Sequence, residues 1–232
     1  MLKLKVIPVI DMFRGKIVLA YKGIREKYRE LKNTVLTEKV DLENIIEALY
    51  NMGFREVYIA DLDAIVHGKT ETLKGKILNI VDEFSNIRFL IDIGRLGLQL
   101  KPPHNVNWVI GTEYLNFNDL LRLKPNVLSL DMFGNNVTFR RGSITLLEIV
   151  PKLKSLKLKE VLAIFLDRVG SLEGPNYLVA SYLANMLNEN CRVIVGGGIR
   201  DKGDLYALKL LGVDAVLVAT AIHKGIINAS EI

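Results

Sequence analysis

Two aspartates stand in the same local context, 120 residues apart. Asp11 and Asp131 each follow an apolar run of strand length, and each is followed by Met-Phe. A positioned carboxyl group can give a proton to a substrate or take one from it. An ordinary aspartate has a pKa of about 3.9, so acid catalysis near neutrality would require burial or a neighbouring charge to raise that pKa. A single aspartate after a strand is more often a turn or cap residue, but the matched pair favours a general acid and a general base.

A glycine-rich segment near the end of the chain has the features of a phosphate site. Residues 193–200 read VIVGGGIR, and apolar residues at helical spacing resume at 205–211. Glycines let the backbone approach a ligand closely, and a helix N-terminus offers unpaired N–H groups to an anion. The strand-like run 215–218 ends in ATA, so two neighbouring strand ends could share one phosphate. The alternative is a tight turn without a ligand. A dinucleotide fingerprint fits poorly, because its third glycine would fall on Asp201.

Eight apolar runs of strand length recur along the chain, and stretches of helical period separate most of them. The runs are 6–10, 57–60, 89–93, 108–110, 127–130, 161–165, 193–195 and 215–218, and the helical stretches are 42–52, 73–84, 120–123 with its flanks, 144–153, 177–187 and 205–211. Continuous apolar strands alternating with helices indicate a parallel sheet covered by helices, and eight such units indicate a closed (β/α)8 TIM barrel. A doubly wound sheet would not need eight strands. We therefore expect an α/β fold with a single domain over residues 1–232.

The two halves of the chain, about 1–122 and 123–232, look like copies of each other. Matched segments lie 104 to 120 residues apart: 11–13 and 131–133, 62–63 and 166–167, 88–94 and 192–198, and 108–112 and 216–220. Four matches in order predict a duplicated half-barrel. Active sites of such barrels lie at the C-terminal ends of the strands. Asp11 and Asp131, on strands one and five, are therefore predicted to face each other across the mouth.

The composition of the chain indicates which classes of ligand and partner it could bind. The formal net charge of +5 and the pI near 9.2 favour an anionic small molecule, and no basic stripe with interleaved aromatic residues supports nucleic-acid binding. The single cysteine, Cys191, fits a reducing compartment. No run has the length of a membrane span and no signal-peptide region is present, so we expect a soluble cytoplasmic protein. No metal site is expected, because His67, His104 and His223 have no partners at metal-ligand spacing.

Motifs spread over residues 7 to about 224 carry a family resemblance. They are IPVIDMFRGKIV at 7–18, DLD at 61–63, IGT at 110–112, LD at 130–131, GSLEGPN at 170–176, GGGIR at 196–200 and ATA at 219–221. Together they resemble the histidine-biosynthesis barrels, the family of ProFAR isomerase and of the cyclase subunit of imidazole glycerol phosphate synthase. The resemblance is to ProFAR isomerase above all and implies an aldose–ketose isomerisation of an N-glycosylamine phosphate without a cofactor. It assigns Asp11 as the general base and Asp131 as the general acid.

The resemblance also implies where a substrate with two phosphates binds. One phosphate site, between strands three and four, matches Gly94, Gly111 and Thr112. The other, between strands seven and eight, matches Gly170, Ser171, Gly197, Gly198, Ala219 and Thr220. Three further residues of the matching segments, Arg14, Asp63 and Arg168, are expected to contact the sugar phosphate.

The chain departs from the family pattern in three places. The Thr and Asp expected around strand six are replaced by Ile164 and Val169, and the first glycine loop contains Asp92. A carboxylate repels a phosphate, so we expect phosphate to occupy the second site before the first unless Arg95 offsets Asp92. The charged loop 25–32 is expected to be a solvated surface, with a lid over an anionic ligand as the alternative.

These departures leave other functions open. The chain could be a paralogue that acts on a different sugar phosphate, or a phosphate-ligand binding protein with little catalysis. The cyclase subunit is the weaker alternative, because it needs a glutaminase partner and an ammonia route through the barrel floor. Nothing in the sequence sets the oligomeric state.

Overall fold

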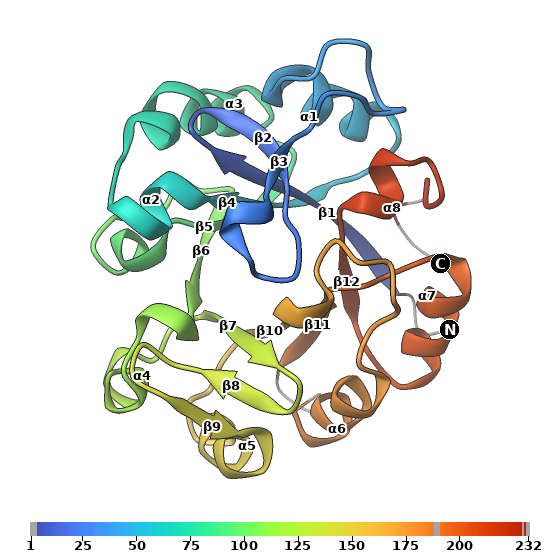
Figure 1. Cartoon of the computed structure of the whole chain (residues 1–232). Coiled ribbons are helices and arrows are strands. Elements are labelled where there is room, and N and C mark those ends of the chain that lie inside the picture. The colour runs from blue at the N-terminus through green and yellow to red at the C-terminus, as the bar shows by residue number, and fades with distance from the viewer. Residues whose placement is uncertain (1–3, 188–190, 229, 231–232) are drawn as a thin grey trace.

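Eight parallel strands close into a barrel in the computed structural model, which describes residues 4–187, 191–228 and 230 (Figure 1). In ring order they are β1 (Lys5–Phe13), β4 (Glu56–Asp61), β5 (Arg88–Asp92), β6 (Val106–Gly111), β7 (Val127–Phe133), β10 (Glu160–Phe165), β11 (Arg192–Gly196) and β12 (Ala215–Val218). Each strand pairs in parallel with the next, and β12 pairs with β1. The predicted apolar runs fall on these strands, so the predicted α/β barrel is confirmed.

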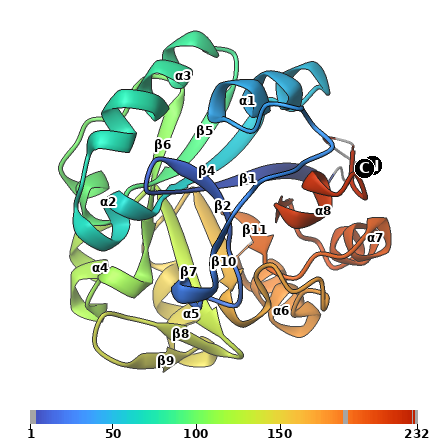
Figure 2. The same cartoon turned by 45° about the horizontal axis from the view of Figure 1, so that its top comes forward.

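Helices cover the outside of the barrel (Figures 1 and 2). They are α1 (Leu42–Asn51), α2 (Leu62–His67), α3 (Leu78–Glu83), α4 (Phe117–Leu123), α5 (Leu146–Lys154), α6 (Tyr177–Leu187), α7 (Lys202–Leu210) and α8 (Thr220–His223). Caps mark several starts, as predicted for such segments. The side chain of Asp41 accepts the N–H of Asn44 ahead of α1, and Asp201 accepts the N–H groups of Gly203 and Asp204 at the start of α7.

Two predicted helices begin differently in the structure. The stretch 73–84 starts with a wide turn, η2 (Leu73–Ile77), before α3. The stretch 144–153 becomes helical only at Leu146, because the residues ahead of it form the edge strand β9 (Ser143–Thr145). Thr145 then caps α5, since its hydroxyl accepts the N–H of Glu148 at 3.3 Å.

The first and fifth barrel strands both continue past the barrel as hairpins. β1 pairs with β2 (Lys16–Leu19), which pairs with β3 (Arg29–Glu30); β7 pairs with β8 (Asn136–Thr138), which pairs with β9. A glycine with positive φ lies in each first turn, Gly15 at +70° and Gly134 at +57°, a region that favours glycine. The two halves therefore share a hairpin at the same step of the fold.

Apolar side chains fill the inside of the barrel. On β1, Ile7 belongs to the inner cluster, whereas Val6 belongs to the cluster between strands and helices. The inner cluster is Ile7, Val18, Tyr58, Ala60, Leu62, Leu90, Val109, Val127, Leu162, Ile194, Ala215 and Leu217. Such a barrel is a packed core and not a pore, so the space for a ligand lies at the mouth.

Four charged residues close the opposite end of the barrel, and we call them the floor ring: Glu56, Arg88, Glu160 and Arg192. Each is the first residue of its strand, β4, β5, β10 or β11. Arg192 donates to both carboxylate oxygens of Glu56, with Nη1–Oε1 and Nη2–Oε2 distances of 2.6 and 2.9 Å. Arg88 donates to Glu56 and to Glu160. Because these strands lie on opposite sides of the barrel, the floor ring spans its interior.

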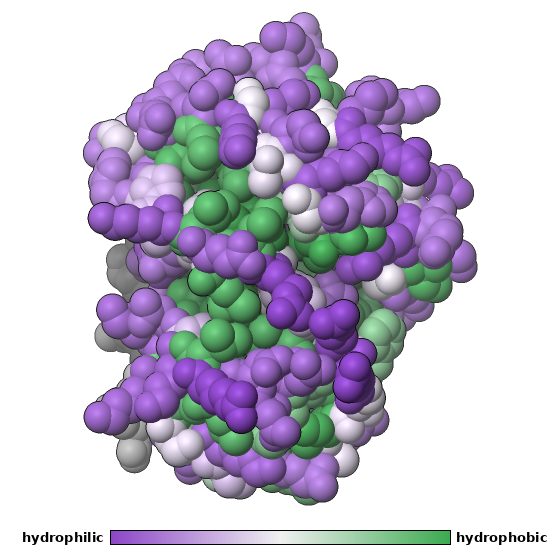
Figure 3. Space-filling view, turned by 90° about the vertical axis from the view of Figure 1, so that its left-hand side faces the viewer, coloured by the Kyte–Doolittle hydropathy of each residue, from purple (hydrophilic) through white to green (hydrophobic). Residues whose placement is uncertain are grey.

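The face shown in Figure 3 has apolar side chains in several places between polar ones. α2 exposes Val66, and α4 exposes Leu121 and Leu123; each of these residues is between 38% and 41% exposed. In the part of the chain that the structure describes, no helix is long and apolar enough to cross a membrane.

Candidate active site

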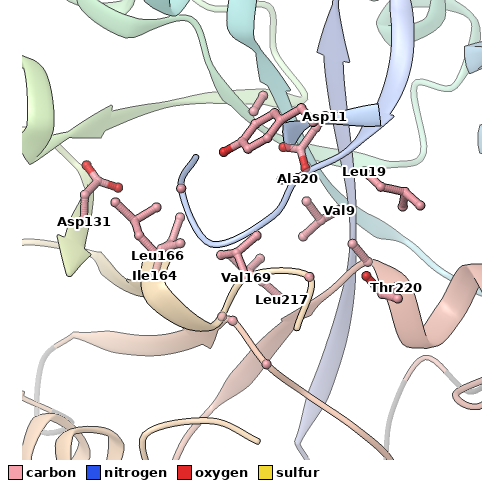
Figure 4. Close-up of a pocket in the computed structure, with 18 of the residues that line it drawn as sticks. Val9, Asp11, Leu19, Ala20, Asp131, Ile164, Leu166, Val169, Leu217 and Thr220 are labelled. Atoms are coloured by element: carbon pink, nitrogen blue, oxygen red, sulfur yellow. The ribbon is translucent and has the colours of Figure 1, made fainter. Parts of the chain in front are cut away.

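A cavity of about 410 Å³ opens at the C-terminal ends of the barrel strands. Asp11 on β1 and Asp131 on β7 both line it. Figure 4 shows their side chains on opposite sides of the cavity, with apolar side chains between them. The two aspartates that the sequence paired therefore share one cavity, as a general acid and a general base on one small substrate require.

Asp131 is held firmly in place. It is 6% exposed, and its Oδ2 accepts the N–H of Glu113 at 3.1 Å while its Oδ1 accepts the hydroxyl of Ser129 at 3.1 Å. Burial raises the pKa of Asp131 to about 8, and the neighbouring charges of Glu113 and Asp92 add to the rise. Asp131 therefore holds a proton near neutrality, as a general acid must.

Asp11 has a different environment. Its carboxyl group accepts no hydrogen bond from the described residues, and burial raises its pKa to about 7. A carboxyl group with that pKa is ionised in about half of the molecules at neutral pH. Asp11 is therefore both basic enough and free enough to take a proton from a bound molecule.

A third carboxyl group, that of Asp92 at the end of β5, also lines the cavity. Its Oδ1 accepts the hydroxyl of Tyr114 at 2.6 Å and the N–H of Gly94 at 2.8 Å. Burial raises the pKa of Asp92 to about 7, although these two hydrogen bonds oppose the rise. The charge of Arg25, from the loop after strand one, also opposes the rise.

Tyr58 is a cavity residue that the sequence analysis missed. Its side chain is 4% exposed and lines the cavity, and its hydroxyl has no hydrogen-bond partner among the described residues. Burial and the charges of Asp92, Asp131 and Asp11 raise its pKa well above the ordinary value, so the hydroxyl keeps its proton. A tyrosine within an apolar strand resembles any core residue, and only the closure of the barrel places it among three carboxyl groups.

Apolar side chains form one wall of the cavity, and we call them the apolar wall: Ile164, Leu166, Val169 and Leu217. Figure 4 shows Ile164 and Leu166 beside Asp131, with Val169 and Leu217 below both aspartates. Ile164 and Val169 are the two replacements that the sequence analysis noted, and both line the cavity. The wall lowers the local polarity, which accounts for the direction of the pKa shifts of the aspartates.

Most residues predicted for the second phosphate site line the cavity: Gly170, Gly197, Gly198, Ala219 and Thr220. The N–H groups of Gly197 and Gly198 have no acceptor among the described residues. Their φ angles are +105° and +84°, and a Cβ at either position would collide with a backbone carbonyl group, so only glycine fits. Ser171 lies off the cavity, where its hydroxyl donates to the carbonyl of Arg168 at 2.8 Å. This end of the cavity, the β11/β12 end, therefore offers two backbone N–H groups without acceptors among the described residues, and none of the five lining residues named here carries a carboxylate.

The residues predicted for the first phosphate site do not line the cavity. Gly94, Gly111 and Thr112 are all buried beside it. The N–H of Gly111 donates to the hydroxyl of Tyr114 at 2.6 Å, and Thr112 Oγ1 lies 3.5 Å from Asp131 Oδ2. This end, the β5/β6 end, presents carboxyl groups to the cavity instead.

The three further contacts expected from the sequence also lie away from the cavity. Arg14 is exposed, and its backbone N–H donates to Asp63 Oδ2 at 2.5 Å. Arg168 Nη1 donates to the carbonyl of Gly174 at 2.9 Å. The side chains of Asp63 and Arg168 therefore hold backbone groups of the loops around the mouth, and none of the three residues lines the cavity.

The loop after β2, residues 20–28, crosses the mouth, and we call it the mouth loop (Figures 1 and 2). Arg25 Nη2 lies 2.9 and 3.2 Å from the two carboxylate oxygens of Glu113, and Lys22 Nζ lies 2.7 Å from Glu173 Oε1. The N–H of Lys22 also donates to the carbonyl of Val169 at 2.8 Å. Residues 25–28 of the charged loop 25–32 belong to the mouth loop, and the choice between a solvated surface and a lid for that loop stays a prediction.

No group of three or more His, Cys, Asp or Glu side chains within the described residues could hold a metal ion. His223, one of the three histidines, is 8% exposed, and its Nδ1 lies 3.1 Å from Thr34 Oγ1. Burial lowers the pKa of His223 to about 4.

The fold and the site define a TIM-barrel protein with an aspartate pair at the mouth and a glycine-lined end suited to an anion. The family described as "Histidine biosynthesis protein" matches residues 5–228. The chain belongs to this family, which confirms the resemblance drawn from its motifs.

Individual relatives match along almost their whole length. An uncharacterized protein of Methanocaldococcus jannaschii is 32% identical over 236 residues, covering 99% of this chain and 97% of that protein. The 1-(5-phosphoribosyl)-5-((5-phosphoribosylamino)methylideneamino) imidazole-4-carboxamide isomerase of Clostridium novyi is 25% identical, covering 97% of this chain and 96% of that protein. The isomerase of the same name from Lactococcus lactis is 27% identical, covering 98% of both chains.

Proposed function

We propose that this chain is an intramolecular aldose–ketose isomerase that acts on an N-glycosylamine sugar phosphate without a cofactor. The observation that carries the proposal is the pair of aspartates on opposite sides of one cavity, with pKa values raised to about 7 and about 8. The family membership and the isomerases among its relatives support the same reaction class.

The protonation states suggest which aspartate plays which role. Asp131, with the higher pKa, donates its proton to the ring oxygen of the sugar, and the ring opens to a protonated Schiff base. Asp11, ionised in about half of the molecules, then removes the proton from C2. The electrons of the C2–H bond form a C1–C2 double bond while the π electrons of the C1–N bond move to the nitrogen, which gives an enaminol. C1 then takes a proton and the C2 hydroxyl gives one up, so the ketose forms without a net gain or loss of protons. The iminium group of the substrate is the electron sink, so no cofactor is needed.

The surroundings of the pair suit this chemistry. A Schiff base is hydrolysed by water, and the apolar wall and the mouth loop both restrict access of water to the cavity. Tyr58 adds a protonated hydroxyl that can donate a hydrogen bond to an oxygen on which negative charge develops. The enzyme would therefore bind a sugar phosphate under a closed loop.

A paralogue acting on a sugar phosphate other than the substrate named for the relatives is the second candidate. The replacement of polar residues by Ile164 and Val169 in the cavity, and the carboxyl group of Asp92 at the β5/β6 end, favour it. Both candidates use the same aspartate pair, so they differ in substrate and not in reaction type.

Two experiments test the proposal. Complementation of an isomerase-deficient histidine auxotroph decides whether the substrate is that of the relatives. If growth fails, a screen of phosphorylated aminosugar adducts with the purified protein identifies the alternative substrate. On the substrate that is turned over, Asp11→Asn and Asp131→Asn should each lower kcat by about 10² to 10⁴. The matched control is Asp82→Asn, an exposed carboxylate on α3, which should leave kcat unchanged. Normal turnover by both active-site variants would refute the assignment.

A further inference from the structure

The two ends of the cavity occupy equivalent places in the two halves of the barrel but offer a phosphate different surroundings. At an offset of 104 residues, Asp92 corresponds to Gly196 and Gly94 corresponds to Gly198. The second half thus has a glycine where the first half has a carboxyl group. Any difference in phosphate binding between the ends must come from this exchange and from what surrounds it.

At the β5/β6 end, the backbone donors are already used within the protein. The N–H of Gly94 donates to Asp92 Oδ1 at 2.8 Å, and the N–H of Gly111 donates to the hydroxyl of Tyr114 at 2.6 Å. The N–H of Glu113 donates to Asp131 Oδ2 at 3.1 Å. Two protein carboxylates and a hydroxyl group therefore accept the hydrogen bonds that a phosphate would need.

The β11/β12 end has the opposite properties. Gly197 and Gly198 line the cavity, and their N–H groups have no acceptor among the described residues. The lining residues Ile199, Ala219 and Thr220, which follow β11 and β12 in the chain, carry no negative charge. Two free backbone donors beside a hydroxyl group can bind one phosphate.

We propose that Asp92, held in place by Tyr114, is a specificity-determining residue that closes the β5/β6 end to phosphate, so that the substrate is a sugar monophosphate. This inference rests on the proposed function. The single phosphate binds at the β11/β12 end, and the other end of the substrate presents a group without negative charge to Asp92. The name printed for the isomerase relatives contains two phosphoribosyl groups, so the substrate of this chain differs from theirs by one phosphate.

Binding of a matched pair of probes tests the proposal without any turnover. Ribulose 5-phosphate and ribulose 1,5-bisphosphate are titrated into the wild-type chain by calorimetry, and the bound phosphates are located by crystallography. The wild-type chain should bind one phosphate, at the β11/β12 end, and the two probes should bind within about threefold of each other. The double variant Asp92→Gly/Tyr114→Phe removes the competing acceptors, so it should bind the bisphosphate at least about tenfold more tightly than the wild type does.

Two further variants separate the effect of charge on phosphate binding from an effect on folding. Asp92→Asn keeps the shape of the side chain and removes its charge, so it tests the charge if the double variant does not fold. Thr220→Asp places a carboxylate at the open end and should weaken both probes by about tenfold or more.

The outcomes distinguish failure of the monophosphate inference from failure of the proposed isomerase function. Phosphate at both ends of the wild-type chain, or a bisphosphate preference of tenfold or more, would overturn the monophosphate inference and leave the proposed isomerase standing. Absence of phosphate from both ends would overturn the proposed function as well.

Discussion

The floor and the mouth of this barrel bury carboxyl groups to a similar extent and treat them in opposite ways. Glu56 in the floor ring is 7% exposed, and Asp131 at the mouth is 6% exposed. Burial alone would raise the pKa of Glu56, but the hydrogen bonds and charge of Arg192, with the charge of Arg88, lower it. Burial raises the pKa of Asp131 to about 8, and its charged neighbours add to the rise because they are carboxylates.

The difference shows that burial by itself does not decide the charge of a carboxyl group. Arg88 and Arg192 each pair with both glutamates of the floor ring, which suits a structural role at the end of the barrel opposite the mouth. Among the described residues that line the cavity, Arg25 of the mouth loop is the one arginine or lysine, and its ion pair is with Glu113. The carboxyl group of Asp131 at the mouth therefore keeps a proton that it can transfer, whereas the carboxyl group of Glu56 in the floor ring stays charged.

The largest effect is expected from breaking the floor ring. Arg192→Met removes the bidentate partner of Glu56 and leaves a buried carboxylate without it, which should lower the free energy of unfolding by about 3 to 5 kcal/mol. Urea denaturation measures the change. Arg141→Met is the matched control, because Arg141 is exposed and makes no ion pair with the described residues; it should change stability by less than about 0.5 kcal/mol. Equal effects of the two variants would mean that the floor ring adds no stability.

A pH titration of stability should distinguish the two ends. The raised pKa of Asp131 makes its contribution complete in acid and lost as pH rises toward about 8. The lowered pKa of Glu56 makes its contribution complete above its ordinary pKa and lost as pH falls below it. Between pH 5 and 9, Asp131→Asn should therefore gain about 1 to 3 kcal/mol relative to the wild type. Urea unfolding of both proteins at each pH measures this.

The control for the titration is again Asp82→Asn on α3, which should run parallel to the wild type over the whole pH range. If Asp131→Asn also ran parallel, the carboxyl group of Asp131 would have an ordinary pKa. The acid–base assignment would then lose its physical basis.

The smallest effect is expected at the mouth loop. The Arg25–Glu113 ion pair is partly exposed, with the two side chains 40% and 32% exposed, and such pairs contribute less than about 1 kcal/mol. A double-mutant cycle with Arg25→Gln and Glu113→Gln should give a coupling energy below that value. The loop could then open readily for substrate, whereas the floor stays closed. A coupling as large as that of the floor ring would contradict the idea of a mobile lid.

The sequence by itself predicted the barrel and its aspartate pair. Apolar runs such as 127–130 and 161–165 predict strands of a parallel sheet, because a strand that is buried on both faces of the sheet is apolar along its whole length. The repeat then placed Asp11 and Asp131 at equivalent strand ends, on opposite sides of the ring. The GGG motif at 196–198 predicted a sharp turn after the strand, and the positive φ angles of Gly197 and Gly198 are of the kind that glycine favours.

Only the tertiary structure decided how the charged and polar groups are paired. Glu56 and Arg192 are 136 residues apart, and Arg25 and Glu113 are 88 residues apart, so no local pattern joins them. Tyr58 looks like a core residue until the closed ring turns it toward the carboxyl groups. The sequence indicated that Asp92 would repel a phosphate, but nothing in it identified Tyr114 as the hydrogen-bond partner of Asp92. Electrostatic pairing depends on distances across the barrel, and these exist only once the last strand closes against the first.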